Sequence, residues 1–176
     1  MKTTLCTSLI FAAALTGASA SFGSGSTAAK ATAVVELDDP ASFTDFKISS
    51  WSTEKDTEVL SAELRREINR LAGSLLPEGY RVTMRIHDID MAGDFEPYRR
   101  PPLDDVRIVR SIYAPRMKVG YTVTDAAGNV VSSGERNLID TTFDMMVRMP
   151  RPDVEHLRIE TEMVGNFLRE IARSAS

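Results

Sequence analysis

The chain has 176 residues, with 21 basic and 25 acidic side chains and a formal net charge of −4. This length suits a single domain that can bury its own core. The acidic balance excludes a protein that holds nucleic acid or anionic lipid by bulk positive charge.

The first twenty residues have the three parts of a secretory signal peptide. Lys2 supplies the positive charge, an apolar stretch runs from Leu5 to Ala18, and small residues at Ala18 and Ala20 form a cleavage site. We expect cleavage after Ala20, a periplasmic or secreted location, and loss of the only cysteine, Cys6, with the peptide. A mature chain without cysteine has no disulfide, thiol redox chemistry or cysteine-based zinc site. No later segment is apolar for long enough to predict a transmembrane helix.

Small and polar residues at 21–31 predict a flexible leader, followed by a single domain at 32–173. The β-branched segment Thr32 to Leu37 predicts a first strand. A helix is predicted from Glu54 to Leu76, with Thr53 as its N-cap. It has one apolar stripe at helical spacing, formed by Leu60, Leu64, Ile68, Leu71 and Leu75.

Apolar and polar residues then alternate with the period of a strand over 80–87, 106–112 and 117–124. A short turn at 125–129 allows Val130 to Leu138 to return as the hairpin partner of the last of these. The segment 143–149 fits either a strand or a helical turn and stays unassigned. Asp153 is the predicted cap of a last helix, whose stripe consists of Leu157, Val164, Phe167, Leu168 and Ile171. The fold class is therefore α+β: one mixed, mostly antiparallel sheet of about four to five strands, with two helices packed on one face.

The connection from Asp90 to Asp105 is the first candidate for function, because it is long, polar and rich in proline. It places aromatic and guanidinium side chains in a stiffened loop, and such groups often anchor interfaces. The candidate binding residues are Phe95, Glu96, Tyr98, Arg99, Arg100 and Arg107. The structural alternative is that the aromatic rings enter the core while the arginines pair with nearby acids.

The same stretch, and the methionines further along the chain, offer other chemistry. The acids Asp88, Asp90, Asp94 and Glu96 would suit a hydrolase if two carboxyl groups stood about 5–10 Å apart. A calcium loop fits poorly, because Ala92 takes a ligand position and Arg99 stands where a bidentate acid belongs. Thioethers of Met145, Met146 and Met149 suit Cu(I), but no histidine or cysteine lies beside them in the sequence.

Histidine, the usual general base near neutral pH, occurs only at His87 and His156. Adjacent strand residues point to opposite faces, so Asp88 is badly placed to orient His87. We therefore predict no catalytic residue, no metal ligand and no cofactor.

Several ordered strings resemble one family: DIDMAGDFEPYRR at 88–100, DVRI at 105–108, YAPR at 113–116, and YTVTD at 121–125 with Gly134-Glu135. They resemble the exported bacterial domain-of-unknown-function family numbered 3016, and the likeness runs from about Val34 to Ile171. Tyr98 stands where many members carry tryptophan. The resemblance implies an exported bacterial protein and supplies no activity, ligand or catalytic residue.

The leading functional hypothesis is a noncatalytic envelope protein. It would bind a partner, either an envelope protein or a surface ligand, through the loop 88–107 or through an exposed sheet edge. The alternatives are a hydrolase of envelope polymers and a metal-binding accessory protein. Neither nucleic acid binding nor a transmembrane segment is expected.

Overall fold

The computed structural model describes residues 29–96, 100, 105–143 and 156–174. The predicted signal peptide, most of the leader, Tyr98, Arg99, the methionines at 145–149 and the predicted cap Asp153 lie outside these residues. None of the helices in the described part is long and apolar enough to cross a membrane.

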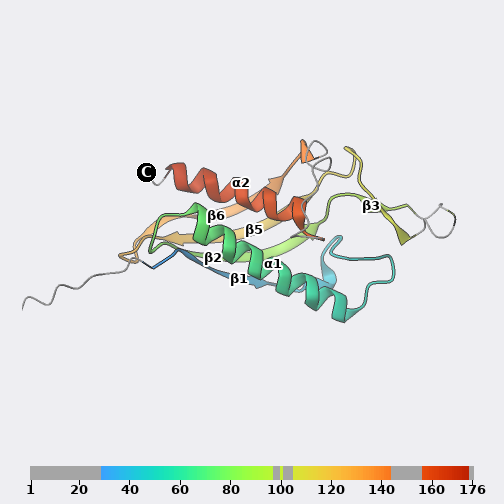
Figure 1. The fold of residues 1–176 in the computed structure, drawn as a ribbon, viewed down its shortest axis with the longest axis horizontal. Helices are drawn as coiled ribbons and strands as arrows, with labels where there is room; N and C mark the ends of the chain where they lie inside the picture. The colour runs from blue at the N-terminus through green and yellow to red at the C-terminus, as the bar shows by residue number, and fades with distance from the viewer. Residues whose placement is uncertain (1–28, 97–99, 101–104, 144–155, 175–176) are drawn as a thin grey trace, which may run out of the picture.

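The fold is α+β, as predicted, with two helices lying over one face of a four-stranded sheet (Figure 1). The sheet order is β1-β2-β5-β6, and its bounds are β1 Thr32–Leu37, β2 Arg81–Asp90, β5 Arg116–Thr124 and β6 Val130–Ile139. The helices are α1 Glu54–Leu75 and α2 Arg158–Ser174, and a short 3-10 helix, η1, spans Pro40–Ser42. Only the β1–β2 pair is parallel, so the sheet is mixed and mostly antiparallel.

Helix α1 begins where the sequence places its cap. The Thr53 hydroxyl accepts from the Asp56 N–H, and the Asp56 carboxylate accepts from the Thr53 N–H, which completes a capping box. Leu64 and Ile68 of the predicted stripe are fully buried. The helix ends at Leu75, because the backbone of Leu76 is already extended before Pro77. Gly79 then adopts a left-handed conformation with φ of 80° in the turn that leads to β2.

The sheet alternates between a dry face and a wet face. Val82, Met84 and Ile86 of β2 are buried under the helices, and their neighbours Arg81, Thr83 and Arg85 are exposed. The apolar stripe of α2 packs on the same side: Leu157, Val164, Phe167, Leu168 and Ile171 are all buried. The dry face is therefore the core, and the opposite face of the sheet is open.

The predicted strand over 106–112 is wrong. Only Arg107–Ile108 form a strand, β4, which pairs with β3 (Asp94–Phe95) in a small separate sheet. The chain then turns, with the Tyr113 N–H bonded to the Arg110 carbonyl, and Ile112 is exposed. Alternation predicts a strand only where one face of the strand is buried. At 106–112 no such face is buried, so the alternation does not mark a strand there.

Candidate functional site

The turn Met91–Gly93 follows β2 and is held from three directions. The Met91 N–H donates to the Asp45 carbonyl at 3.0 Å, and the Gly93 N–H donates to the Tyr113 carbonyl at 3.1 Å. Gly93 has φ of 85°, and a Cβ there would lie 2.8 Å from the Ile108 carbonyl oxygen. This turn fixes the base of the long connection that the sequence singled out.

Arg107 clamps the same turn to the loop that follows β1. Its guanidinium forms a two-pronged ion pair with Asp45, at 2.6 and 3.1 Å, and also donates to the carbonyls of Gly93 and Lys47. The guanidinium carbon lies 4.5 Å from the centre of the Phe95 ring. The side chains of Arg107 and Asp45 are both only 16% exposed. Most of the hydrogen-bonding capacity of Arg107 is therefore used inside the protein.

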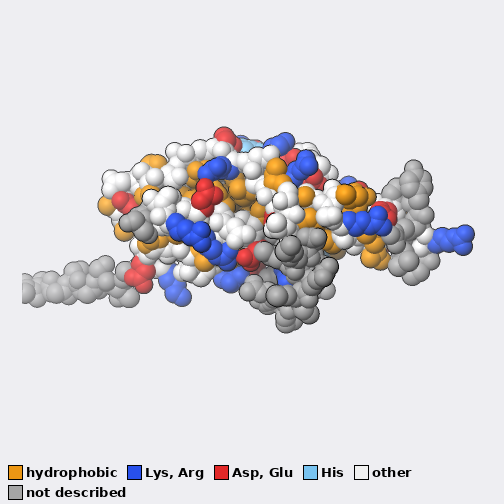
Figure 2. Space-filling view, turned by 90° about the horizontal axis from the view of Figure 1, so that it is seen from above, with side chains coloured by type: hydrophobic (Ala, Val, Ile, Leu, Met, Phe, Trp, Pro, Cys, Tyr) orange, Lys and Arg blue, Asp and Glu red, His pale blue; other side chains and the backbone are white. Residues whose placement is uncertain are grey.

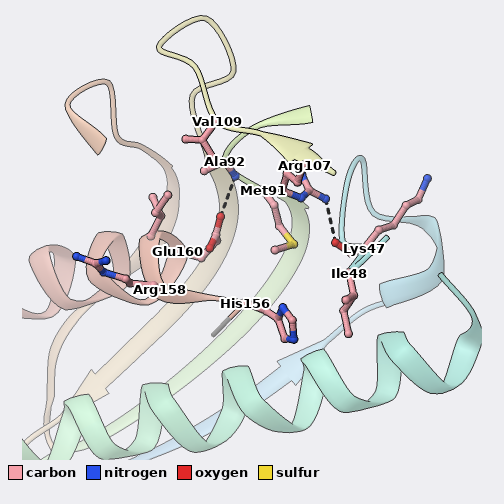
Figure 3. A pocket seen from close by; sticks show the side chains of 10 residues that line it. Lys47, Ile48, Met91, Ala92, Arg107, Val109, His156, Arg158 and Glu160 are labelled. Atoms are coloured by element: carbon pink, nitrogen blue, oxygen red, sulfur yellow. Dashed lines mark hydrogen bonds between the residues drawn. The ribbon is translucent and has the colours of Figure 1, made fainter. Parts of the chain in front are cut away.

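Glu160, in the first turn of α2, is a buried acid with 2% of its surface exposed. Its carboxylate accepts from the Ala92 N–H at 2.8 Å, so α2 holds the third N–H of the turn (Figure 3). Burial raises the pKa of Glu160, and the Ala92 hydrogen bond and the charge of Arg107 only partly offset that effect.

Beside this buried acid lies a cavity of about 280 Å³. Four segments line it with apolar and basic side chains and the one acid, Glu160: the lining residues are Lys47, Ile48, Met91, Ala92, Arg107, Val109, His156, Arg158, Ile159 and Glu160 (Figure 3). The volume falls just below the usual range of about 300–1,000 Å³ for ligand pockets. His156, which the sequence left without a role, thus stands at the wall of a small cavity.

The remaining candidate binding residues are divided. The Phe95 ring is half-buried beneath Arg107, and the Glu96 carboxylate pairs with Arg110 at 2.9 Å. Arg100 is exposed. Tyr98 and Arg99 lie outside the described residues, so a binding role for this stretch stays a prediction.

The acids on and after β2 do not share one environment. Burial acts to raise the pKa of Asp88, but hydrogen bonds from the Thr44 N–H and hydroxyl, and from Lys118, outweigh it and hold that pKa below its usual range. Burial and the charge of Asp45 instead raise the pKa of Asp90. Within the described ranges, no group of three or more His, Cys, Asp or Glu side chains is placed to hold a metal ion.

His87 does not bond to Asp88, as the strand geometry predicts. Its Nδ1 lies 2.8 Å from an Asp38 carboxylate oxygen, and its Nε2 lies 3.3 Å from a Glu135 oxygen. Glu135 reaches His87 from two strands away because Gly120, on the strand between them, has no side chain. A Cβ on Gly120 would lie 2.8 Å from Glu135 Oε1 and 3.1 Å from His87 Nε2.

The two edges of the sheet differ. On β1, the Ala33 N–H donates to the Asn69 side chain of α1 at 2.9 Å, and the Val35 carbonyl accepts from Arg65 of α1 at 3.3 Å. On β6, no strand of the described part pairs with the outer edge, and most of the ten residues are exposed. Helix side chains thus occupy two outer backbone groups of β1, whereas no strand of the described residues occupies the outer edge of β6.

Sequence reasoning missed Asp45, Glu160 and Trp51. Asp45 and Glu160 lie far from the 88–107 loop in sequence, and no local pattern distinguishes a clamping acid from a solvated one. Trp51 is the only tryptophan and is 80% exposed, next to Ser50, which bonds Asp105. A lone tryptophan in a polar, weakly patterned segment was a signal that could have marked it.

Fold and site together define a small α+β domain with one open sheet edge and a clamped loop at the end of its central strands. The chain matches, over residues 31–170, the family described as "Protein of unknown function (DUF3016)", and it belongs to that family. The family resemblance expected from the sequence is therefore confirmed. No curated protein and no solved structure matched the chain.

Proposed function

We propose that this chain is an exported, noncatalytic binding protein that accepts an extended segment of a partner along β6. The observation that carries the proposal is the difference between the two sheet edges. Asn69 and Arg65 occupy outer backbone groups of β1, whereas no described strand occupies those of β6. An added strand would satisfy the free N–H and C=O groups of β6 with main-chain hydrogen bonds.

The edge is long enough for such pairing. β6 has ten residues, which span about 33 Å at the usual rise per residue of a strand. Its partner β5 pairs with it along almost the whole length, so the edge has a rigid support. The predicted signal peptide supports a periplasmic or secreted setting for the partner.

The loop 88–107 supports partner binding less well. Three of the candidate side chains have partners inside the protein: Arg107 pairs with Asp45 and lies over the Phe95 ring, and Glu96 pairs with Arg110. On the face that Figure 2 shows, basic and acidic side chains are interspersed. We therefore place the first contact at β6 rather than at this loop.

The proposal can be tested in two steps. Peptides that bind the protein are first selected from a random decapeptide library displayed on phage, and amide hydrogen exchange of the protein is then measured with and without them. Bound peptides should slow amide exchange in residues 130–139. Every second N–H of an added strand faces β6. N-methylation of either the odd-numbered or the even-numbered peptide residues should therefore abolish binding, and N-methylation of the other set should leave it nearly intact. Protection confined to residues 91–113, or equal tolerance of both alternations, would contradict strand addition.

A hydrolase is the second candidate, and one observation favours it. Asp90, with its raised pKa, and the exposed Asp94 both line a hollow of about 340 Å³. Two carboxyl groups in different surroundings on one hollow are the arrangement that a general acid and base require. Release of reducing ends or soluble fragments from purified cell-wall polymer, lost on Asp90→Asn, would support it. Equal release by the wild type and by Asp90→Asn would refute it.

A further inference from the structure

The open face of the sheet carries a hollow beside β6 that is suited to a long side chain. It has a volume of about 350 Å³ and is lined by Thr83, Arg85, Gly120, Tyr121, Thr122, Ser133, Gly134 and Glu135. Gly120 forms its floor, because a Cβ there would meet Glu135 and His87. A side chain from a strand added to β6 would reach this hollow across Ser133 or Glu135.

The hollow is lined by one carboxylate, that of Glu135, and one guanidinium, that of Arg85. The Arg85 Nε is held by Asp38, although the charges of Arg85 and Glu135 also attract each other. Glu135 is 76% exposed, and its carboxylate lies 3.3 Å from His87 Nε2. A cation that comes from the outer edge of β6 therefore meets the exposed carboxylate of Glu135 first, because Arg85 lies on β2, two strands further in.

The ends of the same strand are apolar. Val130 is 61% exposed at one end of β6 and Ile139 is 48% exposed at the other. Thr122, Gly120 and Lys118 of β5 pair with Ser133, Glu135 and Asn137, and the Glu135 contacts place these side chains over the open face. A register shift between Val123 and Thr124 of β5 leaves Val131 without a partner, so Val130, five residues from Glu135, pairs with Thr124, four residues from Gly120. Ile139, four residues from Glu135, pairs with Arg116 at the other end. Along this face β6 thus presents an apolar end, a hydroxyl, a carboxylate, an amide and a second apolar end.

We propose that the segment accepted by β6 carries lysine or arginine at its centre and β-branched or other apolar residues four positions to either side. This inference rests on the proposed strand addition and specifies its partner. Residues directly opposite in neighbouring strands share one face, so the central cation lies against Glu135 and each apolar residue lies against an end of β6. The hydroxyls of Ser133 on β6 and Thr122 on β5 can accept further hydrogen bonds of the cation.

Self-pairing fits this surface less well. A symmetric antiparallel pair centred on Glu135 would set two carboxylates against each other, and one centred on Arg136 would set two guanidinium groups against each other. A pair centred on Gly134 avoids both contacts, but it sets each Glu135 against Ser133 and gives the carboxylate no cation. We assign the site to an extended segment of a different protein, because such a segment can place a cation against Glu135. Light scattering on the protein alone should give the monomer mass, and a stable dimer that an added peptide fails to dissociate would overturn this assignment.

Two fluorescein-labelled nonapeptides, VTSTKTSTV and VTSTETSTV, test the central charge at low salt. The lysine peptide should bind the wild type at least about fivefold more tightly than the glutamate peptide. Glu135→Lys should reverse that order. Glu36→Lys is the matched control, because Glu36 is an exposed acid on the opposite edge strand, and the order of affinities should remain unchanged.

Hydrogen exchange in the same samples separates this inference from the proposed function. If both peptides slow exchange in residues 130–139 with equal affinity, the charge preference is wrong and strand addition stands. If neither peptide protects residues 130–139 at millimolar concentration, both the preference and the strand-addition mechanism are overturned. Reversal in Glu36→Lys as well as in Glu135→Lys would show that net charge, and not Glu135, sets the order.

Discussion

Replacing Arg107 by alanine should destabilise the protein by about 3–5 kcal/mol. The change removes both prongs of the ion pair with Asp45, two further hydrogen bonds to backbone carbonyls, and the contact with the Phe95 ring. The larger part of the loss comes from Asp45, which would stay mostly buried without its partner, and breaking such a pair typically costs that amount. Urea denaturation followed by circular dichroism measures the free energy of unfolding.

A double-mutant cycle shows whether the ion pair is the cause. Asp45→Asn removes the charge of the partner, so adding Arg107→Ala to that variant should cost clearly less than Arg107→Ala alone. Hydrogen exchange should show local opening at 91–95 and 105–113 in Arg107→Ala. A loss below about 1 kcal/mol with unchanged exchange would refute the clamp and return Arg107 to the candidates for partner binding.

Three further outcomes are expected. Leu64→Ala, at a fully buried position of α1, should cost about 2–5 kcal/mol in urea melts, and a loss under half a kcal/mol would mean that this stripe is not core. Because burial raises the pKa of Glu160, its contribution to stability is present at low pH and is lost as the pH rises through the raised pKa. Glu160→Gln should therefore flatten that part of the curve of unfolding free energy against pH. An unchanged curve would assign the slope to other groups. Intact-mass measurement on protein from the periplasmic fraction should find Ser21 as the first residue, and a mass that retains residues 1–20 would contradict the proposed export.

Local sequence patterns predicted most of the fold, because each pattern marks either the buried face of a helix or strand or the point where a helix begins. The stripe of α1 and its Thr53 cap depend on residues within one or two turns, and both are confirmed. The alternation in β2 and β5 succeeded for the same reason, since each strand has one face under the helices. At 106–112 the same period misled, because Val106 and Ile112 remain exposed and no helix covers that segment.

The site was less predictable because its contacts join distant parts of the chain. Arg107 was selected for its charge and loop position, but its use depends on Asp45, 62 residues away. Glu160 lies 68 residues from the N–H that it holds. No pattern in a single sequence reports such pairings, and the same holds for the coverage of β1 by Asn69 and Arg65.

The covered edge of β1 has a consequence for how this protein can assemble. An open-ended fibre in which sheets join edge to edge needs two free edges on every molecule, because each molecule must pair with one neighbour on either side. Here Asn69 and Arg65 occupy outer groups of β1, so a copy that joined its neighbour through β6 would present only a blocked edge to the next. Growth along the sheet would stop after one addition. The free edge of β6 can thus coexist with a sheet that does not polymerise along its strands.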